Sequence, residues 1–298
     1  MKIGIAGTGR MGTAIALRLL ELDNEVTVWN RTFRKTAVAT AAGAAIARTP
    51  ADLASRCDSI ITILTNAEAL DQVYTGEDAL LSGNVRDKLF IEMSTVRADD
   101  HRALAPKVAA MEATLLECPV SGTVTPAREG KLFGFAGGAP SAFSDAQPLL
   151  AQLCRRVELI GPLGSGANMK LAANLLLTVF WQALAEACSL MRPVAIQPQR
   201  LIELLADSNI GAGILKVRGE LVASGLQGKG TETATFDVDF MRKDLRDMLS
   251  EAAALEVTLP VAAATLKHFD AASFAGFGEI DATQYPAWWI DHSKTEQD

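Results

Sequence analysis

The first half of the chain alternates short apolar runs with segments of helical periodicity. This alternation is typical of parallel strands joined by crossover helices, which cover faces that the strands alone would expose. The predicted strands are Lys2–Ala6, Glu25–Trp29, Ser59–Leu64, Leu89–Met93, Thr114–Cys118, Lys131–Ala136 and Val157–Ile160. The predicted helices are Met11–Glu21, Phe33–Ala42, Pro50–Ser55, Ala67–Tyr74, Ala98–Met111 and Ser141–Leu153. The pattern predicts an α/β domain with a Rossmann-type, doubly wound parallel sheet.

The pattern changes at Gly161–Gly166, where strand-like runs stop and helical periodicity continues almost to the end. We therefore predict a Rossmann domain over residues 1–163 and an all-helical domain over residues 164–298. Its predicted helices are Ala167–Met191, Pro198–Asp207, Ile214–Ala223, Val238–Leu255 and Leu259–Asp270. Pro193 is expected to end the first of them, a long interdomain helix. From Ser273 onward no period is clear, so an irregular segment or a short helix is expected.

Composition narrows the class of protein. Hydrophobic residues make up 49% of the 298 residues and the formal net charge is −7, which excludes a chain that is mainly disordered. No segment concentrates Lys and Arg, so neither nucleic acid nor a membrane surface is an expected partner. Residues 171–190 reach the length of a membrane span, but Asn174, Gln182 and Glu186 interrupt them, which favours a buried helix. Four widely spaced cysteines and a start without an apolar leader predict reduced thiols in a cytoplasmic protein.

A glycine motif follows the first predicted strand and opens the first helix. It reads Gly7-Thr8-Gly9-Arg10-Met11-Gly12. In this context GxGxxG indicates a dinucleotide site, because the first two glycines allow a tight turn and close approach to a pyrophosphate. The third lets helix and strand pack, and the helix N-terminus faces the anion. A glycine-rich turn without a ligand is the alternative.

The end of the second predicted strand bears on the choice of cofactor. An acidic residue there would bind the adenosine ribose of NAD, but the sequence reads Asn30-Arg31-Thr32, with Arg34 and Lys35 close behind. A guanidinium suits a 2′-phosphate, so NADP is favoured over NAD. Alternatively, Arg31 stacks on the adenine of either cofactor.

These residues resemble the β-hydroxyacid dehydrogenase family, which includes 3-hydroxyisobutyrate dehydrogenases and the reductases of glyoxylate, succinic semialdehyde and tartronate semialdehyde. Besides the glycine loop, Glu92–Val96 is similar to the segment that ends the strand beside the nicotinamide, and Leu64-Thr65-Asn66 to a loop across the cofactor. The resemblance implies cofactor contacts for Leu64, Thr65 and Thr95. It also implies a homodimer or homotetramer.

The segment from Glu117 to Gly130 is similar to the family's substrate-binding signature. A strand end that runs into Ser121-Gly122 presents a hydroxyl and backbone N–H groups, which suit a carboxylate. The resemblance implies that Ser121 and Gly122 anchor the substrate acid. Thr123 stands where the family has a second glycine and Glu117 where it has aspartate, so Thr123 adds bulk beside the anchor. A tight turn without ligand is the alternative for Ser121-Gly122 alone.

The segment Gly164–Asn174 resembles the family's catalytic segment, with Lys170 as the catalytic lysine and Asn174 its neighbour. Their spacing places both on one helix face, a turn apart. An amine in a partly desolvated cleft can exchange a proton near neutral pH. A solvated lysine at the start of a buried helix is the alternative.

A third segment, Phe236–Leu245, is similar to the family's Lys-Asp-Leu segment near the active cleft. By this resemblance Lys243 faces substrate and nicotinamide, and Phe240 lies on the pocket wall. We interpret Asp244 as structural, because a carboxylate early in a helix stabilises its N-terminus. A plain amphipathic helix with a charged face also accounts for these residues.

Together these features predict an NADPH-dependent oxidoreductase that acts on a small carboxylate-bearing carbonyl or the corresponding hydroxy acid. The alternatives are an imine reductase of the same fold and a non-catalytic NADP-binding oligomerisation module. His101, His268 and His292 lack a second ligand at metal spacing, so no metal is expected and these histidines are interpreted as structural or solvated.

Overall fold

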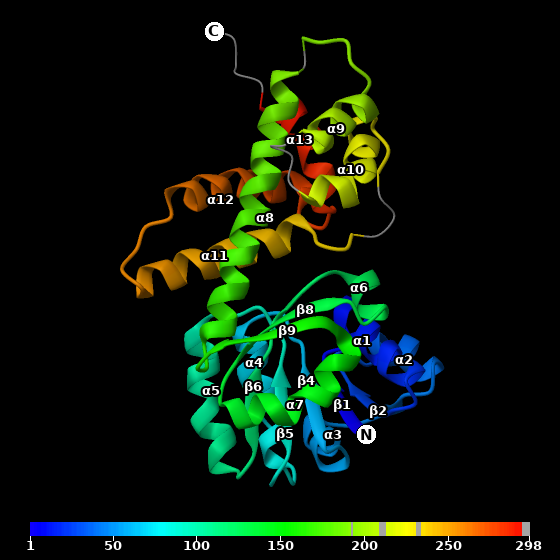
Figure 1. Cartoon of the computed structure of the whole chain (residues 1–298), viewed down its shortest axis with the longest axis vertical. Coiled ribbons are helices and arrows are strands. Elements are labelled where there is room, and N and C mark those ends of the chain that lie inside the picture. Colours follow the sequence, from blue (N-terminus) through cyan, green and yellow to red (C-terminus); the bar gives the residue numbers. More distant parts are fainter. Residues whose placement is uncertain (192, 209–212, 231–233, 294–298) are drawn as a thin grey trace. The chain divides into compact units, whose positions relative to one another are not determined.

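The computed structural model describes residues 1–191, 193–208, 213–230 and 234–293. The chain divides into two compact units, unit 1 (Met1–Leu171) and unit 2 (Ala172–Asp298). The division lies inside the long helix α8 (Ser165–Leu190), somewhat beyond the boundary expected at residue 163. Figure 1 shows the sheet of unit 1 and the helices of unit 2.

Unit 1 contains one nine-stranded sheet. Its strands are β1 (Lys2–Ala6), β2 (Glu25–Trp29), β3 (Ala45–Ile46), β4 (Ser59–Thr62), β5 (Leu89–Glu92), β6 (Thr114–Glu117), β7 (Val120–Ser121), β8 (Leu132–Gly137) and β9 (Cys154–Gly161). The order is β3-β2-β1-β4-β5-β6-β8-β7, and β9 pairs with β8. Strands β1 to β6 are parallel, but β8 runs antiparallel to β6 and β7. The predicted Rossmann-type, doubly wound parallel sheet is therefore confirmed, with one antiparallel strand, β8, toward this edge.

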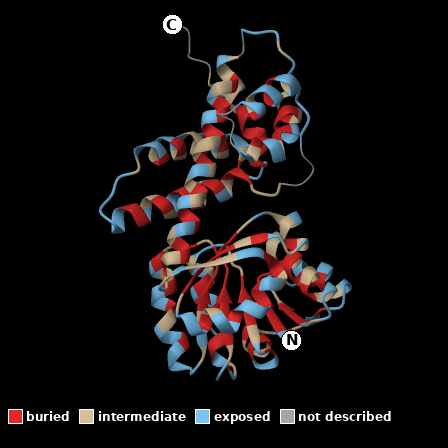
Figure 2. Cartoon of the chain, viewed as in Figure 1, coloured by how far each residue is buried: buried red, intermediate tan, exposed pale blue. Residues whose placement is uncertain are grey.

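Helices cover both faces of the sheet. They are α1 (Arg10–Glu21), α2 (Ala37–Ala41) with the 3₁₀ turn η1 (Phe33–Thr36), α3 (Pro50–Arg56), α4 (Ala67–Thr75), η2 (Leu80–Ser82), α5 (Ala98–Ala110), α6 (Val124–Arg128) and α7 (Pro140–Leu153). Neighbouring strand residues point to opposite sides: Ile61 and Ile91 join the core that includes α1 and α7, whereas Ile60 and Phe90 join the core that includes α3, α4 and α5. Figure 2 shows the strands buried between the two layers, as a doubly wound sheet requires.

Unit 2 is helical. After α8 come α9 (Pro198–Asp207), α10 (Gly213–Leu226), α11 (Val238–Ala254), α12 (Pro260–Ala272), the turns η3 (Ser273–Phe277) and η4 (Ala282–Gln284), and α13 (Tyr285–His292). The expected short helix near the C-terminus is therefore present as α13. Trp288 is buried and stacks on Tyr285, and Trp289 meets His268 edge to face, so both tryptophans pack within unit 2.

By length and composition, α8 is the one helix of the described residues that could cross a membrane. A core helix passes the same test. The polar side chains of Lys170, Asn174, Thr178 and Gln182 are buried along it, which is the pattern of a helix that packs against protein.

Candidate active site

The carboxyl ends of the parallel strands gather the predicted cofactor loops at one edge of unit 1. Gly7 follows β1, Leu64 lies just beyond β4 and Thr95 just beyond β5. The loops touch one another: the backbone N–H of Leu64 donates to the hydroxyl of Ser94, 2.8 Å away. Ligands of open parallel sheets bind at this edge, so the fold places the predicted loops where a dinucleotide would lie.

The glycine loop has the geometry of a dinucleotide site. Gly7 has a φ of +103°, and a Cβ on Gly12 would lie 1.9 Å from the carbonyl oxygen of Gly7, so neither position accepts a side chain. A Cβ on Gly9, by contrast, would meet no atom within 4 Å. Helix α1 begins beside it without a side-chain cap or an acid in its first turn. An uncapped helix N-terminus beside open space fits a pyrophosphate.

Asn30 connects the second strand to this loop. Its Oδ1 accepts the N–H of Thr8 at 3.0 Å, and its Nδ2 donates to the carbonyl of Thr32 at 3.1 Å. Asn30 therefore fixes the glycine loop against the end of β2, a supporting role that the sequence did not indicate. Arg31, like the nearby Arg34 and Lys35, is exposed beyond the strand.

The predicted substrate anchor lies at a second turn of unit 1. Ser121 ends β7, where it pairs with Phe133 of β8, and its side chain is half-buried. Gly122 is exposed and has a φ of +134°, so the turn depends on glycine. Thr123 precedes α6 without capping it through its side chain. The turn thus presents the Ser121 hydroxyl and adjacent backbone groups, which is chemistry suited to a carboxylate.

Lys170 and Asn174 lie on successive turns of α8, and both are buried. Nδ2 of Asn174 donates to Oδ2 of Asp244 on α11, 2.7 Å away. Lys243 pairs with Asp244 at 3.2 Å and with Asp247 at 3.0 Å. Burial lowers the pKa of Lys243, but these two carboxylates outweigh burial and raise it above its usual value, so the amine stays charged.

The structure corrects the reason given for a structural role of Asp244, which does not cap its helix. The N-cap of α11 is Asp237, whose carboxylate accepts the N–H of Phe240 at 2.9 Å. Asp244 lies further along the helix, is 3% exposed and holds Asn174 and Lys243. Phe240 lies on the same helix, with its side chain partly exposed. Asn174, Lys243 and Phe240 thus belong to unit 2, whereas the cofactor loops, Ser121, Gly122, Thr123 and Lys170 belong to unit 1.

Sequence reasoning missed a buried acidic cluster at the same edge of the sheet. Glu92 and Glu117 are register partners at the ends of β5 and β6, and His101 of α5 lies between their carboxyl groups. All three side chains are fully buried. Burial raises the pKa of Glu92 to about 7 and that of Glu117 to about 6, and it lowers the pKa of His101 to about 4. One sequence pattern could have predicted this cluster: an acidic residue ends each of two adjacent strands that are otherwise mostly apolar.

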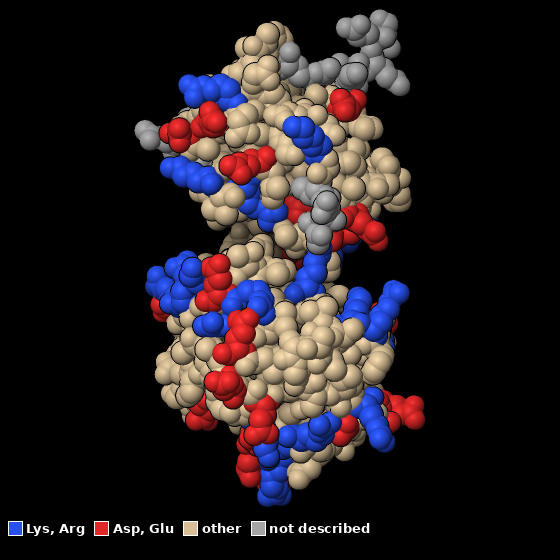
Figure 3. All heavy atoms as spheres, turned by 90° about the vertical axis from the view of Figure 1, so that its right-hand side faces the viewer, with Lys and Arg blue, Asp and Glu red and all other residues tan. Residues whose placement is uncertain are grey.

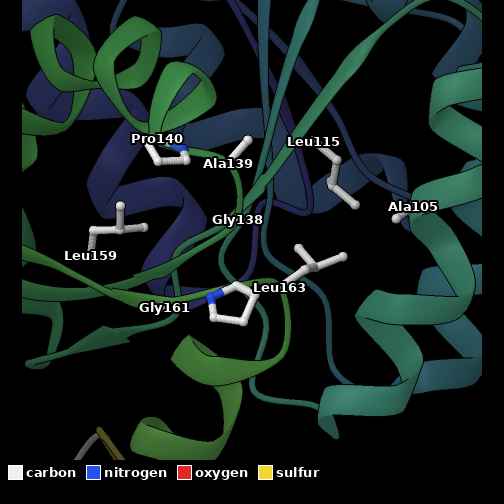
Figure 4. A pocket seen from close by; sticks show the side chains of 9 residues that line it. Ala105, Leu115, Gly138, Ala139, Pro140, Leu159, Gly161 and Leu163 are labelled. Carbon is white, nitrogen blue, oxygen red and sulfur yellow. The ribbon is translucent and has the colours of Figure 1, made fainter.

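Other features of the described residues offer little chemistry. No group of three acidic, His or Cys side chains among them could hold a metal ion. The four cysteines are buried, and burial raises the pKa of Cys154 to about 12 and of Cys188 to about 11, which disfavours the reactive thiolate. A hollow beside α5 and α7 contains no acid, base or nucleophile among its lining residues (Figure 4). On the face in Figure 3, basic and acidic side chains are interspersed.

Comparisons with known proteins indicate the family of the chain. Residues 2–161 match the NAD binding domain of 6-phosphogluconate dehydrogenase, and residues 164–288 match the NAD-binding domain of NADP-dependent 3-hydroxyisobutyrate dehydrogenase. The chain is 29% identical over 281 residues to glyoxylate/succinic semialdehyde reductase 1 of Arabidopsis thaliana, covering 94% of this chain and 96% of the reductase. It is 31% identical over 282 residues to the uncharacterized oxidoreductase YfjR of Bacillus subtilis, covering 94% and 97%.

A solved structure shows the same fold. The 3-hydroxyisobutyrate dehydrogenase of Salmonella typhimurium superposes with a TM-score of 0.84 at 26% identity, covering 95% of this chain and 98% of that one. Fold, glycine loop and comparisons together define an NAD(P)-dependent dehydrogenase or reductase. The chain belongs to the β-hydroxyacid dehydrogenase family.

Proposed function

We propose that the protein is an NADPH-dependent reductase that converts the carbonyl group of a small carboxylate-bearing aldehyde or ketone into a hydroxyl group, with oxidation of the hydroxy acid as the reverse reaction. The observation that supports it best is the buried pair Lys170 and Asn174 on successive turns of α8. Similarity to a glyoxylate/succinic semialdehyde reductase supports the substrate class.

Lys170 acts as the general acid. When bound, NADPH supplies the hydride to the carbonyl carbon, and the ammonium group of Lys170 gives a proton to the carbonyl oxygen. In the reverse direction the neutral amine takes the hydroxyl proton. Because the amide nitrogen of Asn174 is bonded to Asp244, its amide oxygen is turned away from that carboxylate and can accept a hydrogen bond from the substrate hydroxyl or from Lys170.

The substrate carboxylate binds at the turn of Ser121. The Ser121 hydroxyl and the Gly122 N–H donate hydrogen bonds to it, while Thr123 narrows the space beside it and so favours small acids. The family resemblance, rather than a contact in the structure, assigns Lys243 a further positive charge for the substrate and Phe240 an apolar wall. Positioning the carbonyl in this way removes the entropic cost of aligning it with hydride and proton donor.

NADP is preferred over NAD in this proposal. Arg31, with Arg34 and Lys35 nearby, is exposed after β2, and the sequence at the end of that strand is Asn30-Arg31-Thr32, without a carboxylate that would repel a 2′-phosphate. We further propose a cytoplasmic homodimer or homotetramer with neither nucleic acid nor membrane as partner.

A substrate panel tests the proposal. Nicotinamide absorbance is followed with glyoxylate, succinic semialdehyde, methylglyoxal, tartronate semialdehyde and one cyclic imine, using NADPH and NADH in parallel. Turnover of a carboxylate aldehyde with NADPH supports the proposal. Turnover of the imine alone would favour the imine reductase alternative. NADPH binding without any turnover would favour a binding module.

Replacement of the lysine tests the mechanism. Lys170→Ala should lower kcat by roughly 10²- to 10⁴-fold, because the general acid is lost, and leave NADPH affinity unchanged. Lys216→Ala, which removes an exposed lysine of α10, is the matched control and should behave as wild type. Normal turnover by Lys170→Ala would show that another group delivers the proton.

A further inference from the structure

Glu117 binds the start of the helix that carries Lys170. It ends β6, and its Oε1 accepts the backbone N–H groups of Gly164 at 2.8 Å, Gly166 at 2.7 Å and Ala167 at 3.4 Å. These donors belong to the first turn of α8 and the residue before it. A carboxylate at this position satisfies N–H groups that have no partner within the helix and complements its dipole.

Two glycines make room for this carboxylate. A Cβ on Gly137 would lie 2.1 Å from Oε1 of Glu117. A Cβ on Gly166 would lie 3.1 Å from the same oxygen and 2.2 Å from the carbonyl oxygen of Phe135. The local backbone is therefore shaped to admit Glu117 against the helix.

The second oxygen of Glu117 faces His101. Oε2 lies 3.6 Å from Nε2 of the imidazole, and Nδ1 lies 3.4 Å from Oε2 of Glu92, distances slightly longer than a hydrogen bond. Neither ring nitrogen has a hydrogen-bond partner in the described part of the chain. A buried polar atom without a hydrogen bond lowers the stability of the fold. A small movement that brings the imidazole within hydrogen-bond distance of both carboxyl groups is therefore favourable.

The number of protons held by the cluster determines which of its groups can donate a hydrogen bond. Two buried carboxylates side by side repel, so the cluster retains a proton. Oε1 of Glu92 already accepts the N–H of Ser94 at 3.0 Å and its hydroxyl, which leaves Oε2 as the oxygen that carries the proton. With the proton there, the protonated Glu92 oxygen faces Nδ1 of His101 and the Nε2–H of His101 faces the Glu117 carboxylate, so each donor meets an acceptor when the contacts close.

Three other titratable groups face the cluster. The hydroxyl of Tyr74 on α4 is bonded to Thr62 at 2.9 Å, and burial raises its pKa well above the usual value. Burial likewise raises the pKa of the Cys118 thiol, so both groups stay neutral. Arg102 on α5 lowers the pKa of Glu117, but its side chain is half-exposed and bonded to Asp99 at 2.8 Å. None of these three groups therefore removes the proton that Glu92, His101 and Glu117 share.

We propose that Glu117 is a positioning residue for the reaction: it fixes the first turn of α8, and thereby Lys170, against the strand end that leads to Ser121-Gly122, while His101 and Glu92 fix Glu117. The chain Glu92–His101–Glu117 also joins α8 to Ser94, which holds Leu64 of the cofactor loop. The inference rests on the proposed role of Lys170 as general acid.

Kinetics of three variants test the positioning role. Glu117→Gln keeps the shape but loses the charge, so kcat should fall roughly 10- to 100-fold while NADPH affinity and the substrate KM change little. Glu117→Asp keeps the charge on a shorter side chain and should recover part of kcat. Glu112→Gln, which removes an exposed carboxylate paired with Arg86, is the control and should match wild type. Wild-type kcat in Glu117→Gln, or a loss shared equally by kcat and NADPH affinity, would overturn the proposal.

A second measurement does not depend on turnover. Nitrogen chemical shifts of the wild-type imidazoles should show His101 neutral near pH 7 with its proton on Nε2, and in Glu117→Gln the proton should move to Nδ1. Amide exchange at Gly166 and Ala167 should be at least about 10-fold faster in Glu117→Gln. A charged His101, a proton on Nδ1 in the wild type, or unchanged exchange would overturn the inference. If the wild type reduces no carboxylate aldehyde, the proposed function fails, and these shifts and exchange rates still decide whether Glu117 holds α8.

Discussion

At the residue scale, Asp244 shows how one buried carboxylate can organise several site groups. It accepts a hydrogen bond from Asn174 and pairs with Lys243, although the three residues come from two helices. A buried amide has two possible orientations, and the partner of its nitrogen selects one of them. Asp244 thereby determines which end of the Asn174 amide is available to a substrate.

Removal of Asp244 should therefore impair catalysis more than removal of its neighbour Asp247. Asp244→Ala leaves the Asn174 amide nitrogen without its partner and removes one charge from Lys243, so kcat should fall roughly 10-fold or more. Asp247→Ala weakens only the Lys243 pair and should cost far less. Steady-state kinetics of the two variants decide this; equal effects would mean that the orientation of Asn174 is not important.

At the element scale, the β1–loop–α1 unit separates two roles of glycine. Gly12 has no room for a side chain because the Gly7 carbonyl lies against it, whereas Gly9 faces open space with an ordinary φ of −72°. Gly12 serves packing of helix on strand, and Gly9 serves approach of a ligand.

Alanine substitutions should separate these roles. Gly9→Ala should keep the wild-type Tm but weaken NADPH binding by roughly 10-fold or more, because its methyl group occupies the space for the pyrophosphate. Gly12→Ala should destabilise the protein by about 2 kcal/mol or more, because its Cβ collides with backbone. Thermal unfolding and NADPH titration test both. Tight binding by Gly9→Ala would place the pyrophosphate elsewhere.

Elements also differ in how well the sequence predicts them. The ends of α9 coincide with the prediction, and most strands agree within a few residues, because their periodicity is local. Strands β3 and β7 and helix α6 were missed since two to five residues are too few to show a period. The antiparallel direction of β8 was also missed, because an apolar pattern is the same in either direction.

At the scale of the whole molecule, buried titratable groups make stability depend on pH. The pKa of Glu92 is raised from 4.5 in the unfolded chain to about 7 in the folded protein. Its contribution to the free energy of unfolding is therefore fully present below pH 4.5 and is lost as the pH rises through about 7. His101 acts in the opposite sense. Its pKa is lowered from 6.5 to about 4 in the folded protein. Its contribution to the free energy of unfolding is therefore present above pH 6.5 and is lost as the pH falls through about 4.

Glu92→Gln should accordingly flatten the pH dependence of stability. Without the carboxyl group, the free energy of unfolding should fall less between about pH 5 and pH 8 than it does in the wild type. Urea unfolding at several pH values measures this, with the exposed Glu112→Gln as control. A slope equal to that of the wild type would mean that Glu92 is not protonated preferentially in the folded state.

The surface of unit 2 bears on assembly. Leu176 and Val217 are 75% and 81% exposed on α8 and α10, and Leu190 and Phe274 are also exposed. If helices of unit 2 form the proposed oligomer interface, Leu176→Glu combined with Val217→Glu should convert the oligomer into a monomer, because buried charges oppose association. Sedimentation velocity measures this, and an unchanged sedimentation coefficient would place the interface elsewhere.

The sequence by itself determined the alternation of strands and helices, the glycine loop and the spacing of Lys170 and Asn174, because each is a local pattern along the chain. Only the tertiary structure decided the roles of Asn30, Glu117 and Asp244. Each of these side chains bonds to a group far away in sequence, such as Gly166 for Glu117 or Asn174 for Asp244. A buried polar group must find a partner, and which partner it finds depends on packing that brings distant segments together.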